Sequence, residues 1–375
     1  MRIGIIGGGP AGAEAARLLA KEGNEALLFE RKTSWEKPCG GGITPKTFRL
    51  SPHLKSKELP GREIERITFI APSGRRATIS LREPLFIVSR KALFRFQLKR
   101  AEEEGAKLIQ DEIKNIEQKD KSWLLIGKEG YEVDILIGAD GVKSIVRRKL
   151  RGKFRPEELG FALVSFPYGD FPPEIIIRFL SSPPGYLWWF PRIDHASAGI
   201  CTPLIGKGKG LEKLLQKFLK EETPERGEEK GKPISFLTPF LQKGNSSKLY
   251  GENWALIGDA AGLADPLTGE GIYPALLSAH LISRAIKEGN ISAYGEYLRE
   301  KLIPEIESAY RIRRFFFSSK VLELGVSLLA KSKASAEIFS ELTSGELTYR
   351  ELKGRVLSTL PQAAKEFISL IYSGR

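Results

Sequence analysis

Three stretches of the chain share one pattern of hydrophobic and polar positions. Residues 2–30, 134–150 and 251–274 each begin with a short apolar run, which a glycine-containing turn follows. After the turn, the spacing of apolar residues changes to that of a helix. A short unbroken apolar run is typical of a strand buried on both faces of a parallel sheet. We therefore expect an open α/β sheet, whose ligands bind at the carboxyl ends of its strands.

The first unit carries the most specific spacing. Its apolar run at residues 2–6 is followed by Gly7, Gly9 and Gly12, and the next apolar run ends at Glu30. In such a unit the first glycine permits the tight turn, the second admits a pyrophosphate, and the third lets helix and strand pack closely. An acid at the position of Glu30 accepts hydrogen bonds from a ribose. The pattern predicts dinucleotide binding, and a purely structural turn is the alternative.

The other two units each place a carboxylate at the end of a predicted strand. The middle run ends at Asp140-Gly141, and the third ends at Gly258-Asp259, before a helix expected to open near Gly269–Ile272. A carboxylate there can accept from a sugar-like hydroxyl, and a helix N-terminus can face an anion. Taken singly, either unit could be an ordinary strand, turn and helix. Their order along the chain, after the first unit, supports a shared role in binding one ligand.

Together the three units resemble the superfamily of FAD-dependent monooxygenases and reductases. Further motifs resemble its geranylgeranyl reductase branch: PCGGG at residues 38–42 and YLWWFP at residues 186–191. Gly262 stands where the aromatic hydroxylases usually carry histidine after Gly-Asp-Ala-Ala. The resemblance covers roughly residues 1–280, and the remainder matches only as a helical tail.

The resemblance implies an α/β fold in which a Rossmann-type FAD-binding domain is interleaved with an antiparallel-sheet substrate domain, plus a helical C-terminal region. A hairpin is expected over residues 62–80, turning at residues 72–74, with a separate short strand at 85–90 and a helix after it. We expect these domains: residues 1–60, 85–155 and 246–300 for FAD binding, 61–84 and 156–245 for substrate binding, and 301–375 for the helical region.

The same resemblance implies tight, noncovalent FAD. Arg90 holds the family's usual arginine position, at the start of a helix whose N-terminus could face the pyrophosphate. The expected cofactor contacts are Gly7, Gly9, Pro10, Ala11, Gly12, Glu30, Arg31, Cys39, Gly40, Gly41, Arg90, Asp140, Gly141, Gly258, Asp259, Gly269, Gly271 and Ile272.

A strand at residues 186–191 would place Tyr186, Trp188 and Phe190 on one face. The spacing alone suits a core strand better, but in the family this face lines an isoprenoid cavity, so these residues and Pro191 are expected to contact substrate. Cys39 is the candidate catalytic residue, as an active-site liner and a proton donor, and its alternative is a small buried hydrophobe. Cys201 is read as a structural sheet residue.

The expected activity is FAD-dependent reduction of prenyl double bonds by hydride transfer from flavin N5. The substrate would be a geranylgeranyl lipid or diphosphate. An FAD-dependent hydroxylase and a flavoprotein that only relays electrons are the alternatives. Because no second nucleotide-binding unit is evident, the electron donor could be NADPH or an acidic redox protein such as a ferredoxin.

Composition sets further limits on the 375-residue chain. Its net charge of +13 suits anionic partners, although the cations are dispersed and no nucleic-acid motif is evident. Two distant cysteines and no long apolar run predict a cytoplasmic enzyme with at most peripheral membrane contact. Basic residues beside Phe315-Phe316-Phe317 could dock on lipid, but a core helix is preferred. The three histidines show no metal-ligand spacing, and abundant charge with one methionine suggests a thermophile.

Overall fold

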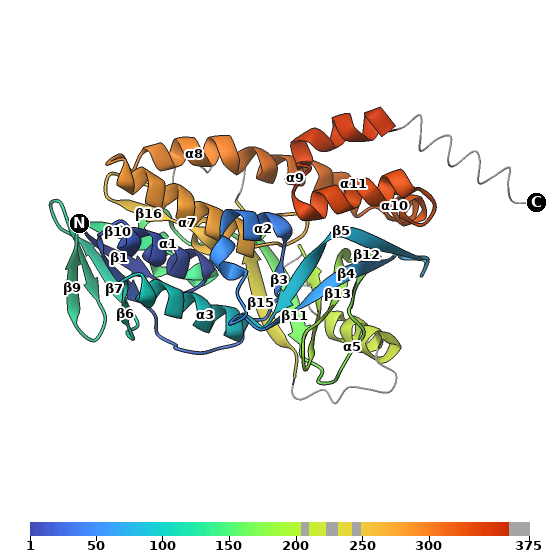
Figure 1. Ribbon diagram of the computed structural model, residues 1–375, viewed down its shortest axis with the longest axis horizontal. Coiled ribbons are helices and arrows are strands. Elements are labelled where there is room, and N and C mark those ends of the chain that lie inside the picture. Colours follow the sequence, from blue (N-terminus) through green and yellow to red (C-terminus); the bar gives the residue numbers. More distant parts are fainter. Residues whose placement is uncertain (204–209, 223–231, 242–248, 360–375) are drawn as a thin grey trace, which may run out of the picture.

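The computed structural model describes residues 1–203, 210–222, 232–241 and 249–359. Two sheets lie next to each other along the long axis, and helices of the C-terminal half extend over both (Figure 1). The first sheet is parallel, with the order β16-β10-β1-β2-β6. Its strands are β1 (Arg2–Ile6), β2 (Glu25–Phe29), β6 (Lys107–Ile109), β10 (Ile135–Gly138) and β16 (Trp254–Leu256).

The parallel sheet is covered on both faces, as its unbroken apolar strands predict. All four residues of β10 are buried. A side chain added at Gly4 in β1 would meet Leu125 and Val133 of a small three-stranded sheet, which therefore packs directly on β1. That small sheet has the order β7-β8-β9 and consists of β7 (Asn115–Gln118), β8 (Trp123–Ile126) and β9 (Gly130–Val133).

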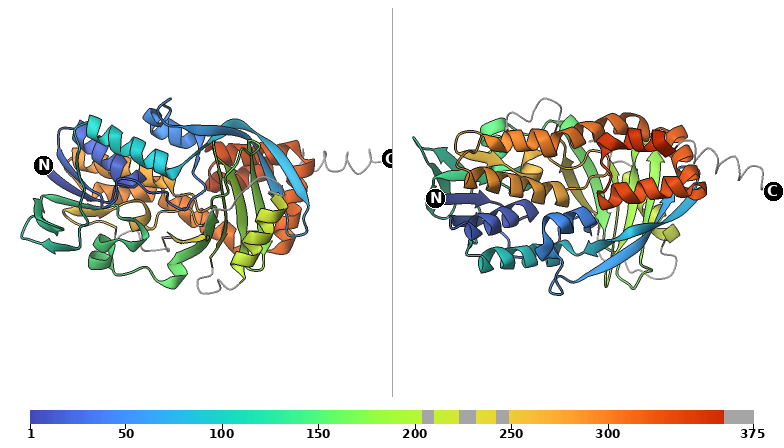
Figure 2. Two further views of the ribbon diagram at one scale, coloured as in Figure 1. Left: turned by 90° about the horizontal axis from the view of Figure 1, so that it is seen from below. Right: turned by 45° about the horizontal axis from the view of Figure 1, so that its top comes forward.

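The second sheet has eight strands and forms the other half of the molecule (Figure 2). Its order is β15-β11-β14-β13-β12-β4-β5-β3, and its strands pair antiparallel except for β12 with β4. The strands are β3 (Gly42–Ile43), β4 (Gly61–Ile70), β5 (Arg76–Val88), β11 (Leu159–Ser165), β12 (Glu174–Ser181), β13 (Pro184–Pro191), β14 (Ala196–Thr202) and β15 (Ile234–Pro239).

Two predicted elements differ in extent from the observed ones. The hairpin at 62–80 is present, but β5 continues to Val88 as one strand, so no separate strand begins at 85. The pairing of β4 with β5 shifts in register between Ile64 and Arg66, and such an irregularity allows a long hairpin to bend. The hairpin thus continues past residue 84, where we expected one domain to end. The third apolar run forms β16 only to Leu256, and Gly258-Asp259 already lie in the next helix.

Helices follow the glycine-rich turns, and they make up most of the described part of the C-terminal third. They are α1 (Pro10–Lys21), α2 (Pro45–Leu50), α3 (Arg90–Glu103), α4 (Ile145–Arg151), α5 (Leu211–Glu222), α6 (Gly258–Ala261), α7 (Ile272–Lys287), α8 (Ala293–Lys301), α9 (Ile303–Phe316), α10 (Ser319–Lys331) and α11 (Lys333–Ser344), with a further helical stretch at 349–359. Short 3-10 turns are η1 (Pro52–Leu54), η2 (Gly141–Lys143) and η3 (Pro156–Glu158). The loop expected after α5 lies largely outside the described residues. None of the described helices combines the length and apolar character that crossing a bilayer requires.

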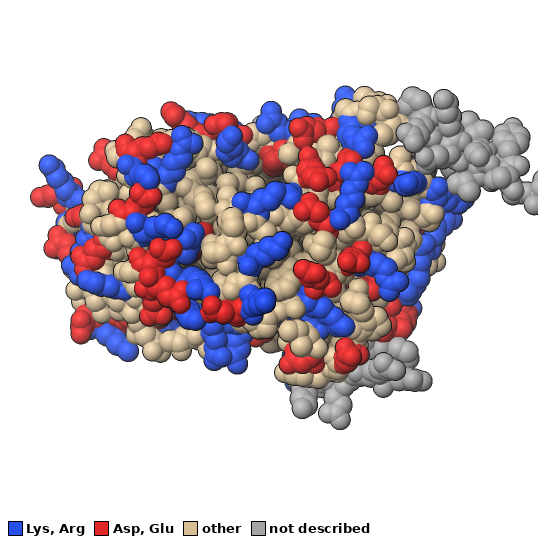
Figure 3. All heavy atoms as spheres, viewed as in Figure 1, with Lys and Arg blue, Asp and Glu red and all other residues tan. Residues whose placement is uncertain are grey.

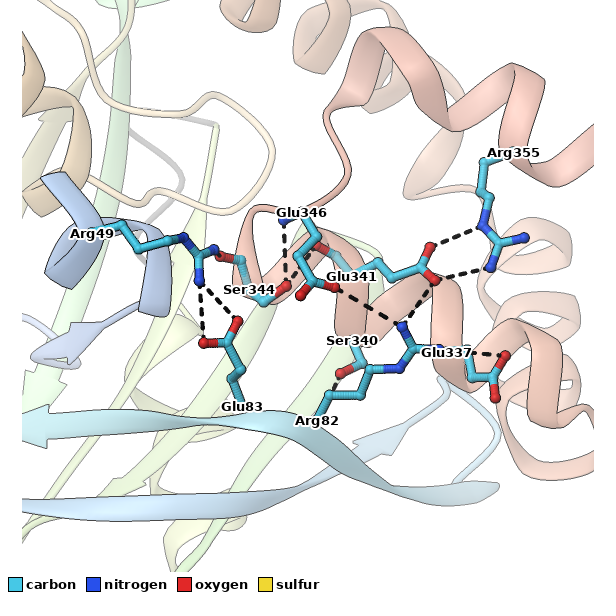
Figure 4. A network of polar contacts seen from close by, with 9 residues as sticks. All are labelled: Arg49, Arg82, Glu83, Glu337, Ser340, Glu341, Ser344, Glu346 and Arg355. Atoms are coloured by element: carbon cyan, nitrogen blue, oxygen red, sulfur yellow. Dashed lines mark hydrogen bonds and ion pairs between the residues drawn. The ribbon is translucent and has the colours of Figure 1, made fainter.

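A network of ion pairs fastens the last helices to β5 (Figure 4). Glu341 of α11 accepts from Arg355 at 2.9 Å and from Arg82 of β5 at 3.3 Å. The Arg82 backbone N–H also donates to the Ser340 hydroxyl at 2.8 Å. Arg49 of α2 donates to the Ser344 carbonyl, at the end of α11. These contacts fix the position of the segment that follows α11.

Candidate functional site

One cavity of about 1500 Å³ extends from the carboxyl ends of the parallel strands to the second sheet. At the first end it is lined by the glycine-rich turn after β1 and by Glu30. At the second end it is lined by Phe179, Trp188 and Phe316, together with other large apolar side chains. A single space therefore joins a nucleotide-type site to an apolar chamber.

The first turn leaves room where a phosphate is expected. A side chain added at Gly9 would have no atom within 4 Å of its Cβ, so the space beside this backbone is open. At Gly12 the added Cβ would lie 1.9 Å from the Gly7 carbonyl oxygen. Gly12 is thus required for close packing of α1 on β1, and Gly9 leaves the approach to the backbone free, as the spacing predicts.

Three carboxylates surround this end of the cavity. Glu30 accepts the Gly8 N–H at 2.8 Å, which holds it beside the glycine turn. Asp140 accepts the Ile145 N–H at 2.7 Å through Oδ2, while its buried Oδ1 has no partner among the described residues. Burial raises the pKa of Asp140, although nearby N–H groups and Ser144 oppose the shift. Asp259 forms an ion pair of 2.7 Å with Lys37, whose role the sequence did not indicate.

Most residues expected at the site line the cavity. They are Gly7, Gly9, Pro10, Ala11, Glu30, Arg31, Cys39, Gly40, Gly41, Arg90, Asp140, Gly141, Asp259, Gly269, Gly271 and Ile272, with Tyr186, Trp188 and Phe190. Gly12, Gly258 and Pro191 are absent from this lining. Gly258 has a φ of +56°, and its added Cβ would lie 2.9 Å from the Ala11 Cβ, so its position suits close packing of α6 against α1.

The loop carrying Cys39 is held from the second sheet. Its carbonyl oxygen accepts from Arg192 and from the Ser197 hydroxyl, each at 2.8 Å. Burial alone would raise the pKa of the Cys39 thiol, but Arg90 and Lys37 lower it overall. Cys39 is therefore a cavity-lining thiol whose pKa lies below its ordinary value. Cys201, which also lines the cavity from β14, has its pKa raised to about 11 by burial.

The start of α3 differs from its expected role. Glu36 accepts the backbone N–H groups of Arg90 and Lys91 at 2.8 and 3.1 Å, and also the Ser89 hydroxyl. A carboxylate of the protein therefore occupies the N-terminus that we expected to face a pyrophosphate. The Arg90 side chain is 7% exposed, lines the cavity, and has a buried Nε without a partner among the described residues.

Strand β13 has the two faces that its alternation predicts. Trp188 packs with Ala162 and Val164, beside Tyr186 and Phe190, and all three aromatic residues of this face line the cavity. Leu187 and Trp189 point to the opposite side, into the cluster that α5 covers. The face expected to meet substrate is therefore the one exposed to the cavity.

Sequence reasoning missed the contribution of the C-terminal segment to the cavity. Leu347, Tyr349 and Leu352 line it, as do Phe316 and Phe317 of the basic aromatic stretch. Of the three phenylalanines in that stretch, only Phe315 is exposed, at 70%. Phe316 and Phe317 are half-buried on the cavity wall, so none of the three phenylalanines belongs to the buried core. No spacing signal distinguished these residues, because they reach the cavity only through long-range packing of the last helices on β5.

Comparisons with known proteins agree with this geometry. A family model described as FAD binding domain matches residues 1–167. The chain is 31% identical to geranylgeranyl diphosphate reductase of Synechocystis sp., over 76% of this chain and 75% of the relative. It is 26% identical to digeranylgeranylglycerophospholipid reductase of Methanocaldococcus jannaschii, over 98% and 97%. A geranylgeranyl bacteriochlorophyll reductase-like protein of Thermoplasma acidophilum shares the fold, with a TM-score of 0.76 at 19% identity over 94% and 98% of the chains.

The residues at the first end of the cavity fit FAD. The open space beside Gly9 suits a pyrophosphate, and Glu30 is placed for a ribose. The atoms Asp140 Oδ1 and Arg90 Nε, which have no partner among the described residues, belong to two residues that line the cavity and leave an acceptor and a donor unsatisfied there. Within the described ranges, no group of three histidine, cysteine or acidic side chains is arranged to hold a metal ion.

Proposed function

This chain belongs to the geranylgeranyl reductase family of FAD-dependent oxidoreductases, and we propose that it saturates carbon–carbon double bonds of a geranylgeranyl lipid or geranylgeranyl diphosphate. The observation that carries the proposal is the joined cavity. A flavin site alone would serve many oxidations, but here it continues into a chamber lined by Tyr186, Trp188 and Phe190. A long isoprenoid chain needs such an apolar wall.

In this proposal each part of the chain has a distinct task. FAD, when bound, supplies the hydride that reduces the alkene. Gly9, Glu30 and Asp140 hold the dinucleotide. The aromatic face of β13 orients the prenyl chain and excludes water, and the Cys39 loop lies at the junction of the two ends. The proton-donor role predicted for Cys39 stays a prediction, which loss of alkene reduction with full FAD content in Cys39→Ala would support.

Two alternatives fit the cavity less well. The hydroxylases carry histidine where Gly262 stands. Gly262 ends α6 with a φ of +80°, and an added Cβ would lie 3.1 Å from the Phe154 ring, so a histidine would be strained here. A flavoprotein that only relays electrons needs no long apolar chamber. The chamber and the glycine therefore both favour the reductase.

The anaerobic reaction tests this function directly. We expect enzyme reduced with dithionite, without oxygen, to convert a geranylgeranyl compound to a product heavier by two hydrogens for each bond reduced, as mass spectrometry would show. Geranylgeranyl diphosphate and an archaeal-type diether lipid are the probes. A product that gains oxygen, formed only when oxygen is present, would instead assign the chain to the hydroxylases.

The electron donor is proposed to be an acidic redox protein that docks near the cavity entrance at α4. Residues 143–155 contain seven cations and no acidic residue. Lys143, Arg148, Lys149 and Lys153 are exposed and form no ion pair with any described residue, and three of them, Lys143, Arg148 and Lys153, line the cavity. By contrast, positive and negative side chains are interspersed over the face shown in Figure 3. Charge of one sign beside the flavin site suits an acidic partner.

Peripheral contact with a membrane is proposed at the outer turn of α9. Phe315 is exposed there and Arg311 and Arg314 lie beside it, while Phe316 and Phe317 line the cavity. An exposed aromatic residue with basic neighbours suits an anionic lipid surface. Loss of vesicle cosedimentation in Phe315→Ser, with unchanged reduction of soluble geranylgeranyl diphosphate, is the expected result.

A further inference from the structure

Helix α6 and the segment that joins it to α7 place three acidic side chains on the cavity wall, and these differ in their partners. Asp259 forms an ion pair with Lys37 at 2.7 Å, and Glu270 forms one with Lys46 at 2.8 Å. Asp265 forms no ion pair with any residue in the described ranges, although it lines the same largely apolar cavity. Because a charge outside any ion pair is costly in such a place, a buried carboxyl kept there is a candidate functional group.

The position of Asp265 is fixed by its own loop and by the substrate wall. Its Oδ1 accepts the backbone N–H groups of Leu267 and Thr268 at 2.7 and 2.9 Å. The Tyr186 hydroxyl donates to the Thr268 carbonyl, which ties this loop to the aromatic face of β13. Tyr349, from the segment after α11, lines the same cavity, and burial together with the nearby Asp265 carboxyl group raises the pKa of its hydroxyl. Asp265 is thus held where the cofactor end meets the apolar chamber.

The surroundings favour the protonated form of this carboxyl group. Burial raises the pKa of Asp265 above its ordinary value, while the N–H groups of Thr268 and Leu267 oppose the shift. The titratable and charged groups that face it from neighbouring elements are Glu270, Lys46, Tyr186, Tyr349 and Arg313. Asp265 therefore keeps its proton to a higher pH than an exposed aspartate does.

We propose that Asp265 is the acid that protonates the substrate alkene, with Tyr349 as the residue that positions its carboxyl group. This assignment rests on the proposed function. Reduction of one double bond adds a hydride to one carbon, with reduced flavin as the source of the electron pair, and a proton to the other. The O–H bond of Asp265 breaks as the new C–H bond forms. The alkene is reduced, the flavin is oxidised, and the carboxylate regains a proton from water before the next turnover.

Asp265 suits this task better than the Cys39 thiol. An isolated alkene is a weak base, so the proton donor must be a strong acid that is still protonated when the substrate arrives. A carboxylic acid is a stronger acid than a thiol, and burial raises the pKa of this one. Arg90 and Lys37 stabilise the thiolate of Cys39. The two residues come from different loops, so variants can separate their contributions.

The test follows flavin reoxidation in a single turnover. Wild type, Asp265→Asn and Cys39→Ala are reduced with dithionite and mixed anaerobically with geranylgeranyl diphosphate from about pH 5 to 9. The wild-type rate should fall as pH rises through the pKa of Asp265, because only the protonated form donates. We expect Asp265→Asn to slow reoxidation about 100-fold and to abolish this alkaline limb, with FAD content unchanged. Cys39→Ala should retain the limb.

Two further variants make the result specific. Glu222→Gln alters another largely buried carboxyl, which lies outside the cavity lining and pairs with Arg76 at 2.7 Å and with Arg178 at 3.2 Å, and it should change neither rate nor limb. Tyr349→Phe removes a hydroxyl that faces Asp265 and can donate to its carboxylate, so its alkaline limb should move to higher pH. A merely structural role for Tyr349 would not move it. This variant also decides the matter if Asp265→Asn does not fold.

The outcomes distinguish a failure of the Asp265 assignment from a failure of the proposed function. If wild type reduces prenyl bonds while Asp265→Asn keeps both the rate and the limb, the assignment of the acid fails and the proposed function stands. An unmoved limb in Tyr349→Phe, or loss of the limb in Cys39→Ala alone, would overturn the assignment in the same way. If wild type reduces no prenyl double bond, the proposed function fails, and the assignment of Asp265 fails with it.

Discussion

At the scale of single residues, Gly9 and Gly12 separate cofactor binding from folding. Gly9→Val should leave the fold intact, because the space around the added Cβ is open, yet it should abolish FAD binding by filling that space. Gly12→Val should instead prevent folding, since its Cβ would overlap the Gly7 carbonyl. The measurements are circular dichroism and bound FAD after reconstitution. A Gly9→Val protein that stays yellow would contradict the assigned pyrophosphate approach.

Glu14 is a second residue with a sharp expectation. It is 1% exposed, and its carboxylate contacts Arg17, His280 and Ser51. Burial alone would raise its pKa, but His280 and Arg17 lower it from 4.5 to about 2. Because the folded pKa is the lower one, Glu14 stabilises the protein above pH 4.5, and this contribution is lost as pH falls toward 2. The difference corresponds to about 3 kcal/mol.

Glu14→Gln should therefore lower the free energy of unfolding at pH 7 and weaken its dependence on acid. Urea unfolding at pH 7 and at about pH 3 would measure both effects. Glu22→Gln is the matched control, because Glu22 pairs with Lys287 on the surface, where ion pairs contribute little. Equal acid sensitivity of wild type and Glu14→Gln would contradict the low pKa.

Residues at the site differ in how well the sequence predicts them. Gly9 and Glu30 are predictable because a fixed local spacing carries their function. Lys37, Glu36 and Arg192 are not, because each acts through a partner distant in sequence. Arg192, in the turn between β13 and β14, for example, donates to the Cys39 carbonyl 153 residues away. Periodicity reports which face of an element is buried and says nothing of such pairs.

At the scale of elements, β13 offers a paired test of its two faces. Trp188→Ala should weaken binding of a prenyl substrate while FAD binding persists, since Trp188 lines the chamber. Trp189→Ala should instead lower the free energy of unfolding by about 3 to 5 kcal/mol, because Trp189 packs in the cluster under α5 and contacts Phe171. Fluorescence titration with a geranylgeranyl compound and urea unfolding distinguish them. If Trp188→Ala and Trp189→Ala changed substrate binding and the free energy of unfolding equally, the two faces of β13 would not have separate roles.

The ion-pair network on α11 supports a second element-scale prediction. Glu341 is the carboxylate shared by Arg82 and Arg355, and these contacts hold the segment that brings Tyr349 to the cavity. Glu341→Gln should destabilise the folded state by about 1 to 3 kcal/mol and expose the 345–359 segment to protease. Glu323→Gln, on the more exposed contact to Ser73, is the control. Unchanged proteolysis of that segment would show that apolar packing alone holds it.

Elements were predictable to different degrees for physical reasons. The βαβ units and the alternating β13 follow from local patterning, since burial on one or two faces leaves a period in the sequence. The unbroken length of β5 does not, because its continuation depends on pairing with β4 and on the bend at Ile64–Arg66. The end of β16 at Leu256 depends likewise on where α6 begins, and an apolar run does not mark that point.

At the scale of the whole molecule, the charge of +13 makes electron delivery sensitive to salt. If an acidic redox protein docks at α4, its association rate should fall steeply between about 50 and 300 mM salt, because screening shortens the reach of the opposed charges. Arg148→Glu with Lys149→Glu should lower the rate at low salt about tenfold or more and flatten the salt dependence. Lys55→Glu with Lys57→Glu makes the same change of net charge at two exposed lysines beside η1, neither of which lines the cavity, and should have a much smaller effect.

Stopped-flow bleaching of the flavin by a reduced ferredoxin measures these rates, with dithionite as the donor that needs no docking. Equal losses in the two double variants would mean that net charge alone steers the partner, and rapid bleaching by micromolar NADPH would assign the donor to a nucleotide instead.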